Sequence, residues 1–272
     1  MSNLSKLVLG TVQFGLQYGI NSAGRPSIEQ VSDILNNAKV GGILILDTSS
    51  AYGNAEEVLG DVKAGESFKI VSKYPKCDKT FNNSLKVLGI DCLYGYLLHH
   101  FEAYRENKSV WNDFVQLQKE GKVDRIGFSL YEPWELDQIL NDGIPFSLIQ
   151  VPYNIFDRQF EPYFKQLKEM GVEIHVRSTF LQGLFFKDRE TLPEKLQPLK
   201  KYLIQLDKYA ASKGVSVGDL ALNYNLHNPY IDGVLIGVDN KEQLLQNFTS
   251  VKDVEINLDI KIEDTELLKP IN

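Results

Sequence analysis

Four side chains that can hold or exchange protons follow three successive apolar runs of the sequence. Asp47 comes at the end of the first run, and Tyr52 follows it by five residues in a stretch of small residues. Lys73 comes near the end of the second run, and His99 comes directly after the apolar residues of the third. A carboxylate, a phenol, an ammonium and an imidazole are therefore candidates for one catalytic site.

This set of groups suits the reduction of a carbonyl or the oxidation of an alcohol. A phenol has an unperturbed pKa of about 10, and a neighbouring ammonium lowers that pKa. We therefore expect Lys73 to lower the pKa of Tyr52, while a salt bridge from Asp47 keeps Lys73 charged and fixed. His99 can hydrogen-bond a substrate oxygen. Tyr52 is then the group that protonates the carbonyl oxygen while hydride reaches the carbon.

Apolar runs alternate with amphipathic stretches along the whole chain. The apolar runs cover residues 7–13, 43–48, 68–74, 93–100, 124–130, 147–153, 173–179 and 233–238. The helical patterns between them cover residues 27–40, 54–62, 80–89, 110–121, 133–143, 160–171, 194–228 and 241–251. Most apolar runs are nearly continuous, as in parallel strands that are covered on both faces.

Eight strands alternating with eight helical regions, without a linker, predict a single (β/α)8 barrel domain over residues 1–272. The alternative is a doubly wound open sheet, which would need a G-x-G-x-x-G turn after its first strand. Gly10, Gly15 and Gly19 do not have that spacing.

Barrel enzymes place their chemistry at the carboxyl ends of the strands. Each of the four candidates alone could be a loop cap, a turn or a solvated charge, but their coincidence at successive strand ends favours catalysis.

Charge and composition limit the classes of partner. The net charge of −7 and the lack of a dense basic patch argue against nucleic acid or an anionic membrane. The N-terminus lacks the long apolar run of a signal peptide or a membrane span. Two cysteines, Cys77 and Cys92, are typical of a reduced, cytoplasmic protein. His175 and His227 add no spacing typical of zinc ligands, so we expect no metal. We expect a monomer or a weak oligomer.

Several motifs, in this order, resemble the aldo-keto reductase family. They are LGTVQFG, DTSSAYG, SKY, LLHH, GFS, QVPYN and IGVDNKEQLLQN, and together they span nearly the whole chain. The resemblance implies a barrel that uses a nicotinamide cofactor and a tetrad of Asp47, Tyr52, Lys73 and His99, with Tyr52 as acid and base. His99 is preferred to His100 because the family's histidine directly follows two apolar strand residues. Neighbouring strand residues also face opposite sides, so both histidines should not point into the barrel mouth.

The resemblance also implies a cofactor site at the strand ends. Its residues would be Gly10, Thr11, Ser129, Gln150, Arg177, Ser178, Leu181, Gly237, Val238, Asp239, Gln243 and Asn247. Ser129 and Gln150 would bind the nicotinamide carboxamide, and Gln243 and Asn247 would lie near the adenosine. Asn240 and Gln243 could also form a helix-capping pair, and the two roles are compatible.

Three positions depart from the family pattern. Lys241 is the only cation in the last motif, and Asp239 would disfavour the 2′-phosphate of NADP(H). We therefore expect NAD(H) to be used at least as readily as NADP(H). Leu130 cannot bond the carboxamide as the family's residue would. Arg177 stands where the family usually stacks an aromatic ring on the nicotinamide, so it would favour the neutral reduced cofactor, reach an anionic substrate group or pair with a carboxylate. The Arg-Ser-x-x-Leu-Gln-Gly pattern resembles a bacterial branch often associated with surface-sugar biosynthesis.

The expected substrate contacts are Tyr18, His100 and Phe101, with Tyr104 and Phe180 as further candidates for the rim of the pocket. The short, acidic tail offers no obvious aromatic lid. An open, polar pocket for a sugar or a sugar derivative is therefore expected.

Two rival functions stay open. One is a nicotinamide-binding regulatory or sensor protein with little turnover, which the departures from the family pattern favour and the intact tetrad disfavours. The other is a metal-dependent hydrolase or isomerase, which the scarcity of histidine and of paired carboxylates at strand ends makes remote.

Overall fold

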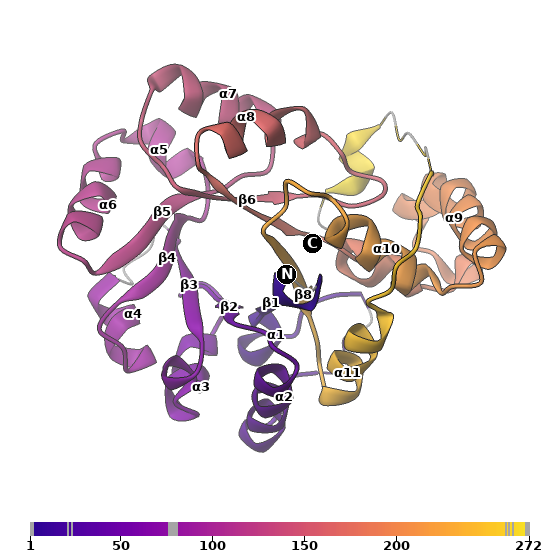
Figure 1. The fold of residues 1–272 in the computed structure, drawn as a ribbon, viewed down its shortest axis with the longest axis horizontal. Helices are drawn as coiled ribbons and strands as arrows, with labels where there is room; N and C mark the ends of the chain where they lie inside the picture. The colour runs from indigo at the N-terminus through magenta and orange to yellow at the C-terminus, as the bar shows by residue number, and fades with distance from the viewer. Residues whose placement is uncertain are drawn as a thin grey trace.

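Eight parallel strands close into a barrel in the computed structural model, which describes residues 3–20, 22, 24–75, 81–258, 260, 262 and 264–269 (Figure 1). The strands pair in chain order, and β8 closes the barrel against β1. They are β1 (Leu7–Gly10), β2 (Ile45–Asp47), β3 (Lys69–Tyr74), β4 (Leu93–Leu98), β5 (Val123–Ser129), β6 (Leu148–Pro152), β7 (Glu173–Arg177) and β8 (Gly233–Gly237). The predicted (β/α)8 fold is confirmed. Cys77 lies outside the described residues.

The helices surround the strands (Figure 1). The α-helices are α1 (Val12–Gly15), α2 (Ile28–Val40), α3 (Ala55–Asp61), α4 (Phe81–Leu88), α5 (Glu102–Glu106), α6 (Val110–Lys119), α7 (Pro133–Asp142), α8 (Phe164–Glu169), α9 (Lys200–Ser212), α10 (Val217–Leu226) and α11 (Lys241–Ser250). The 3-10 turns are η1 (Asn3–Lys6), η2 (Ala64–Glu66), η3 (Glu161–Tyr163), η4 (Leu181–Phe186), η5 (Arg189–Thr191), η6 (Glu194–Leu199) and η7 (Thr265–Leu268). No helix in these ranges is long and apolar enough to cross a membrane.

Two of the differences between the predicted boundaries and the structure show a local cause. The first strand ends at Gly10 instead of residue 13, because the Thr11 N–H donates to the Asp47 carbonyl (2.9 Å) and the chain turns into α1. The long helical pattern over 194–228 splits into η6, α9 and α10. Gly214, with a φ of +66°, makes the turn between the last two helices.

Helix α2 illustrates how the sequence sets an element. The Ser27 hydroxyl accepts a hydrogen bond from the Gln30 N–H, and the Gln30 side chain accepts one from the Ser27 N–H (2.8 Å). This capping box satisfies two of the free N–H groups at the start of the helix. The face turned to the strands carries apolar residues at helical spacing: Val31, Ile34, Leu35 and Ala38.

Buried apolar side chains form one large core between the barrel and its helices, a second cluster beside it, and a small third cluster of Val71, Leu97 and Leu148. The second cluster joins η4, η6, α9 and α10 to the C-terminal segment, whose Ile260, Ile262 and Leu268 are buried there. In Figure 1 this segment, in yellow, runs past α10 and α9. The tail is thus packed against the barrel close to the loops that follow β7.

Candidate active site

A buried ion pair lies at the carboxyl ends of β2 and β3. Lys73 Nζ lies 2.5 Å from Asp47 Oδ1 and donates a second hydrogen bond to the Thr48 carbonyl (2.9 Å). The Lys73 side chain is fully buried. Gln150 Nε2, at the end of β6, donates to Asp47 Oδ2 at 2.7 Å. Both carboxylate oxygens therefore accept a hydrogen bond, and the amide nitrogen of Gln150 donates to Asp47.

Tyr52 is half-buried beside this ion pair. Lys73 Nζ lies 5.1 Å from the Tyr52 ring centroid, and the ring meets His99 edge-on at 5.6 Å. The turn that carries Tyr52 presses against α1: a Cβ on Gly15 would lie 1.7 Å from the Tyr52 carbonyl oxygen. Gly53 turns with a φ of +59° and lies against Gly15 in the same way. These two glycines let the Tyr52 turn pack directly on α1.

The expectation that the pKa of Tyr52 is lowered is wrong for this structure. Burial raises the pKa of Tyr52 well above its usual value, and the Asp47 charge adds to the rise. The Lys73 ammonium is itself neutralised at close range by Asp47, and burial lowers its pKa. Tyr52 is therefore held firmly in its protonated form.

His99 and His100 both line the same cavity, against the expectation that they face opposite sides. Strand β4 ends at Leu98, so strand alternation no longer applies, and the two rings stack at 4.6 Å with a 12° interplanar angle. His99 Nδ1 lies 3.1 Å from the Ser49 hydroxyl. Burial, followed by the charges of Lys73 and its other neighbours, lowers the pKa of His99 to about 2. His99 is therefore a neutral imidazole.

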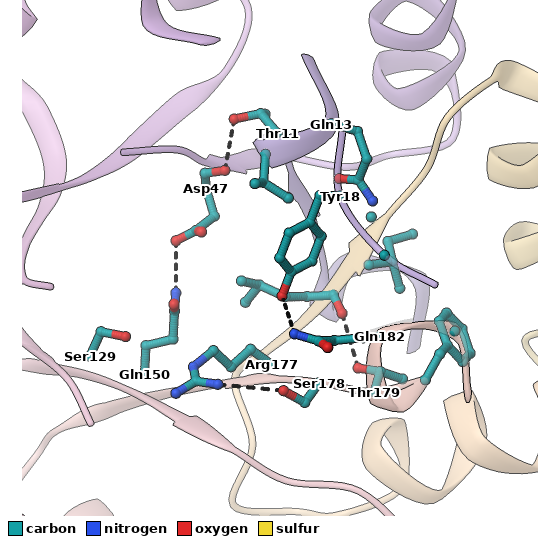
Figure 2. A pocket seen from close by; sticks show the side chains of 18 of the residues that line it. Thr11, Gln13, Tyr18, Asp47, Ser129, Gln150, Arg177, Ser178, Thr179 and Gln182 are labelled. Atoms are coloured by element: carbon teal, nitrogen blue, oxygen red, sulfur yellow. Dashed lines mark hydrogen bonds between the residues drawn. The ribbon is translucent and has the colours of Figure 1, made fainter. Parts of the chain in front are cut away.

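A cavity of about 1050 Å³ opens over these groups. Most of the expected site residues line it: Gly10, Thr11, Tyr18, Asp47, Tyr52, His99, His100, Ser129, Gln150, Arg177, Ser178, Phe180, Gly237, Asp239, Gln243 and Asn247. Figure 2 shows Asp47, Ser129, Gln150 and Arg177 along one side, with Tyr18 and Gln182 facing them. Lys73 lies beneath the lining, fully buried.

Four expected contacts do not reach this cavity. Phe101 and Tyr104 are each 1% exposed and belong to the large core, so their assignment to the substrate pocket and its rim is corrected. Trp134 packs edge-on against Phe101 (5.4 Å) and lines the cavity in its place. The side chains of Leu181 and Val238 are buried in apolar clusters, so these residues could offer a cofactor only their backbone.

Polar side chains line the cavity from the Tyr52 site to β8 and α11. Near β1 and β8 the Gln13 side chain lines it, and Gln13 Oε1 is buried without a hydrogen-bond partner among the described residues. A Cβ on Gly237 would lie 2.5 Å from Gln13 Nε2, so the glycine leaves room for that amide. A buried carbonyl oxygen without a partner is costly. It marks a place where a bound amide or hydroxyl would fit.

The far end of the cavity lies at α11 and contains no Lys or Arg among its lining residues, which are Ser216, Gly218, Asp239, Gln243, Gln246, Asn247 and Ser250. Asn240 caps α11 by accepting from the Gln243 N–H (2.9 Å), and Gln243 Oε1 accepts from the Asp239 N–H (2.7 Å). Lys241, the cation of this motif, lies 3.4 Å from Asp33 and is not in the lining.

Arg177 is half-buried and directed into the cavity wall. Nη2 donates to the Leu130 carbonyl (2.9 Å) and Nη1 to the Ser178 hydroxyl (3.4 Å). Its guanidinium carbon lies 4.1 Å from the Tyr131 ring centroid. The sequence left three partners open for Arg177: the reduced cofactor, an anionic group of the substrate, or a carboxylate of the protein. Among the described residues, no carboxylate forms an ion pair with Arg177.

Sequence reasoning missed Gln13, Tyr131, Trp134 and Gln182. Gln13 lies within the motif LGTVQFG, and Tyr131 comes two residues after Ser129. Their positions just after the ends of strands could have marked both as site residues. Gln182 Nε2 donates to the Tyr18 hydroxyl (2.8 Å) and joins the β7 loop to the segment after α1 (Figure 2). Nothing local in the sequence indicates that long-range contact. The described residues contain no group of three or more His, Cys, Asp or Glu side chains placed to hold a metal.

Comparison with known proteins places the chain among relatives of this fold. The Aldo/keto reductase family model matches residues 6–261. The uncharacterized oxidoreductase YrpG of Bacillus subtilis (strain 168) is 25% identical over 99% of this chain and 91% of its own length. The holo form of aldo-keto reductase AKR11C1 from Bacillus halodurans superposes with a TM-score of 0.74 at 21% identity, over 93% of this chain and 88% of that one. An aldo/keto reductase from Klebsiella pneumoniae, solved in complex with NADP and acetate, gives 0.68 at 21% identity over 93% and 87%. The chain belongs to the aldo/keto reductase family.

Proposed function

We propose that the protein transfers hydride between a nicotinamide cofactor and the carbonyl or alcohol group of a small polar substrate, with Tyr52 as acid and base. Family membership supports the coarser statement, an NAD(P)(H)-dependent oxidoreductase. The observation that carries the finer one is that Tyr52 and His99 line the cavity next to a buried Lys73–Asp47 pair. The bound cofactor would supply or accept the hydride.

Each residue then has a physical role. Asp47 fixes Lys73, and this ion pair lies beside the Tyr52 ring. The raised pKa keeps the Tyr52 proton in place until the carbonyl oxygen takes up negative charge and accepts it. Ser49 accepts the Ala51 N–H (3.1 Å), so its own hydroxyl can donate to His99 Nδ1. His99 Nε2 would then carry a proton toward the substrate oxygen.

The variant Tyr52→Phe tests this assignment. We expect it to lower kcat for reduction of a reactive aromatic aldehyde by about 10²-fold or more, with cofactor affinity kept, because only the transferable proton is removed. Absorbance of the reduced nicotinamide follows the reaction, and cofactor fluorescence measures binding. Tyr230→Phe, on the surface away from the cavity, is the matched control. Tight cofactor binding without turnover that depends on Tyr52 would favour the sensor alternative.

We further propose that NAD(H) is bound at least as tightly as NADP(H). The end of the cavity at α11 carries Asp239 and no lining cation, which disfavours a 2′-phosphate and suits a ribose hydroxyl. The Klebsiella relative binds NADP, so the proposal separates this chain from that protein. Asp239→Ser should shift the ratio of dissociation constants toward NADPH by about tenfold, whereas Glu242→Ser, exposed in the first turn of α11, should not. A clear preference of the unaltered protein for NADPH would contradict the proposal.

A further inference from the structure

The guanidinium of Arg177 forms no salt bridge with a carboxylate of the described residues. It is half-buried, its two donated hydrogen bonds go to the neutral oxygens of Leu130 and Ser178, and Nε is buried without a partner. No carboxylate among the described residues lies within 4.0 Å of it as a salt bridge. A partly desolvated charge without a counter-ion is costly and is stabilised when an anion binds.

Arg177 is also held in place, at the end of a column of stacked planar groups. His99 stacks on His100 (4.6 Å), and His100 stacks on Tyr131 (5.9 Å), with interplanar angles of 12° for both ring pairs. The Arg177 guanidinium lies over the Tyr131 ring, 4.1 Å from its centroid. The faces of these groups are used within the column. Their edges, with the Tyr131 hydroxyl and the His100 nitrogens, are left for other contacts.

The two ends of the column lie in parts of the cavity that differ in their chemical groups. At one end His99 lies edge-on to Tyr52, where a carbonyl oxygen would be protonated. At the other end Arg177 offers a fixed, planar cation (Figure 2). The Tyr131 hydroxyl and the His100 ring form no hydrogen bond with the described part of the chain. A substrate with a carbonyl at one end and an anionic group at the other would match this order.

The carboxylates around Arg177 do not replace such an anion. Glu132 pairs with Lys269 (2.9 Å), and Glu135 accepts the backbone N–H groups of Tyr131 (2.7 Å) and Glu132 (3.0 Å). Asp157 is buried and accepts a hydrogen bond from the Gln159 side chain (3.2 Å); the Arg177 charge acts on it at longer range, but the two form no salt bridge. Glu102 is an exposed residue of the cavity lining and forms no salt bridge with Arg177.

We propose that Arg177 binds an anionic group of the substrate, a carboxylate or a phosphate, so that the preferred substrates are anionic aldehydes or ketones. This proposal rests on the proposed hydride transfer at Tyr52. It makes Arg177 a specificity-determining residue. It also assigns the β5 and β7 loops to substrate selection.

Matched pairs of substrates test it. We would compare 4-carboxybenzaldehyde with its neutral methyl ester, and glyceraldehyde 3-phosphate with glyceraldehyde, at saturating NADH. The unaltered protein should prefer at least one charged member, and Arg177→Gln should lower that charged-to-neutral ratio of kcat/KM by about tenfold or more, since a charge-assisted bidentate contact is lost. The pair that responds tells a carboxylate from a phosphate. Lys165→Gln, an exposed change of equal charge on α8, should leave both ratios unchanged.

Two results would overturn the proposal. One is an unchanged ratio in Arg177→Gln. The other is an equal loss for charged and neutral substrates together with weaker NADH binding, which would make Arg177 a cofactor contact. If no aldehyde is reduced, the hydride-transfer proposal fails by itself. Calorimetric binding of 4-carboxybenzaldehyde and of its methyl ester to both proteins then decides whether Arg177 selects the anion.

Discussion

At the residue scale, the site keeps its acid protonated and its imidazole neutral. Burial and the Asp47 charge raise the pKa of Tyr52 well above 10, and burial with neighbouring cations lowers the pKa of His99 to about 2. Neither group changes its charge near neutral pH. Burial in the cavity wall therefore keeps Tyr52 as a proton donor and His99 as an uncharged hydrogen-bonding partner.

This arrangement predicts a flat pH profile for carbonyl reduction. The kcat at saturating reduced cofactor should change by less than about twofold between roughly pH 5.5 and 9. Stopped-flow or steady-state nicotinamide absorbance at constant ionic strength measures it. A loss of kcat with a midpoint inside that interval would mean that Tyr52 or His99 titrates there, and the assigned protonation states would then be wrong.

The Lys73–Asp47 pair predicts a second effect, on stability as well as activity. Lys73→Met would leave a buried carboxylate whose remaining side-chain donor is Gln150, so we expect a loss of about 3–5 kcal/mol in the free energy of unfolding. Adding Asp47→Asn removes the uncompensated charge and should recover most of that loss, but not turnover. Urea unfolding and kcat measure the two effects. A double variant no more stable than Lys73→Met would show that the ion pair is not the cause.

At the element scale, the catalytic turn depends on how closely it packs on α1. Gly15→Ala would place a methyl group about where the Tyr52 carbonyl lies, at 1.7 Å, with Ala55 N at 2.6 Å. The turn must move, and because catalysis needs reacting atoms held within a fraction of an ångström, kcat should fall at least about tenfold. Cofactor binding at the far end of the cavity should be less affected.

Gly214→Ala is the control for this prediction. It strains a glycine with a φ of +66°, in open space between α9 and α10, that does not line the cavity. We expect it to cost roughly 1 kcal/mol of stability without lowering kcat. Equal effects of the two alanine variants on kcat would contradict a specific role for the Gly15 contact.

The elements also explain what the sequence could and could not predict. Barrel topology and the strand-end positions of Asp47, Lys73 and His99 follow from periodicity, because parallel strands end at one rim. The stacked column of His100 and Tyr131, and the burial of Phe101, depend on side-chain directions beyond the strand ends. Those directions are set by loop packing, which periodicity does not encode.

At the scale of the whole molecule, the two ends of the barrel carry charged side chains in different arrangements. The carboxyl ends of the strands hold the cavity. At the opposite end, Glu173 accepts hydrogen bonds from the Tyr94 hydroxyl (2.6 Å) and lies 2.7 Å from both His175 Nε2 and Arg125 Nε. A Cβ on Gly233 would lie 2.5 Å from the His175 ring, so the imidazole is packed directly on β8. This network joins β4, β5, β7 and β8 and touches no catalytic group.

The network predicts a pH dependence of stability that is separate from activity. Although burial acts to raise it, the pKa of Glu173 is lowered to about 2 by His175, Tyr94 and Arg125. A carboxyl with a lowered pKa in the folded state stabilises the fold above its unfolded value of about 4.5, and that contribution disappears as the pH falls toward 2. Glu173→Gln should therefore cost on the order of 2–3 kcal/mol at pH 7, and its deficit should shrink between about pH 5 and 3. Urea unfolding at each pH measures it, beside the exposed control Glu169→Gln on α8. A deficit that does not change with pH would mean that shape and hydrogen bonding, and not the ionised carboxylate, stabilise this end of the barrel.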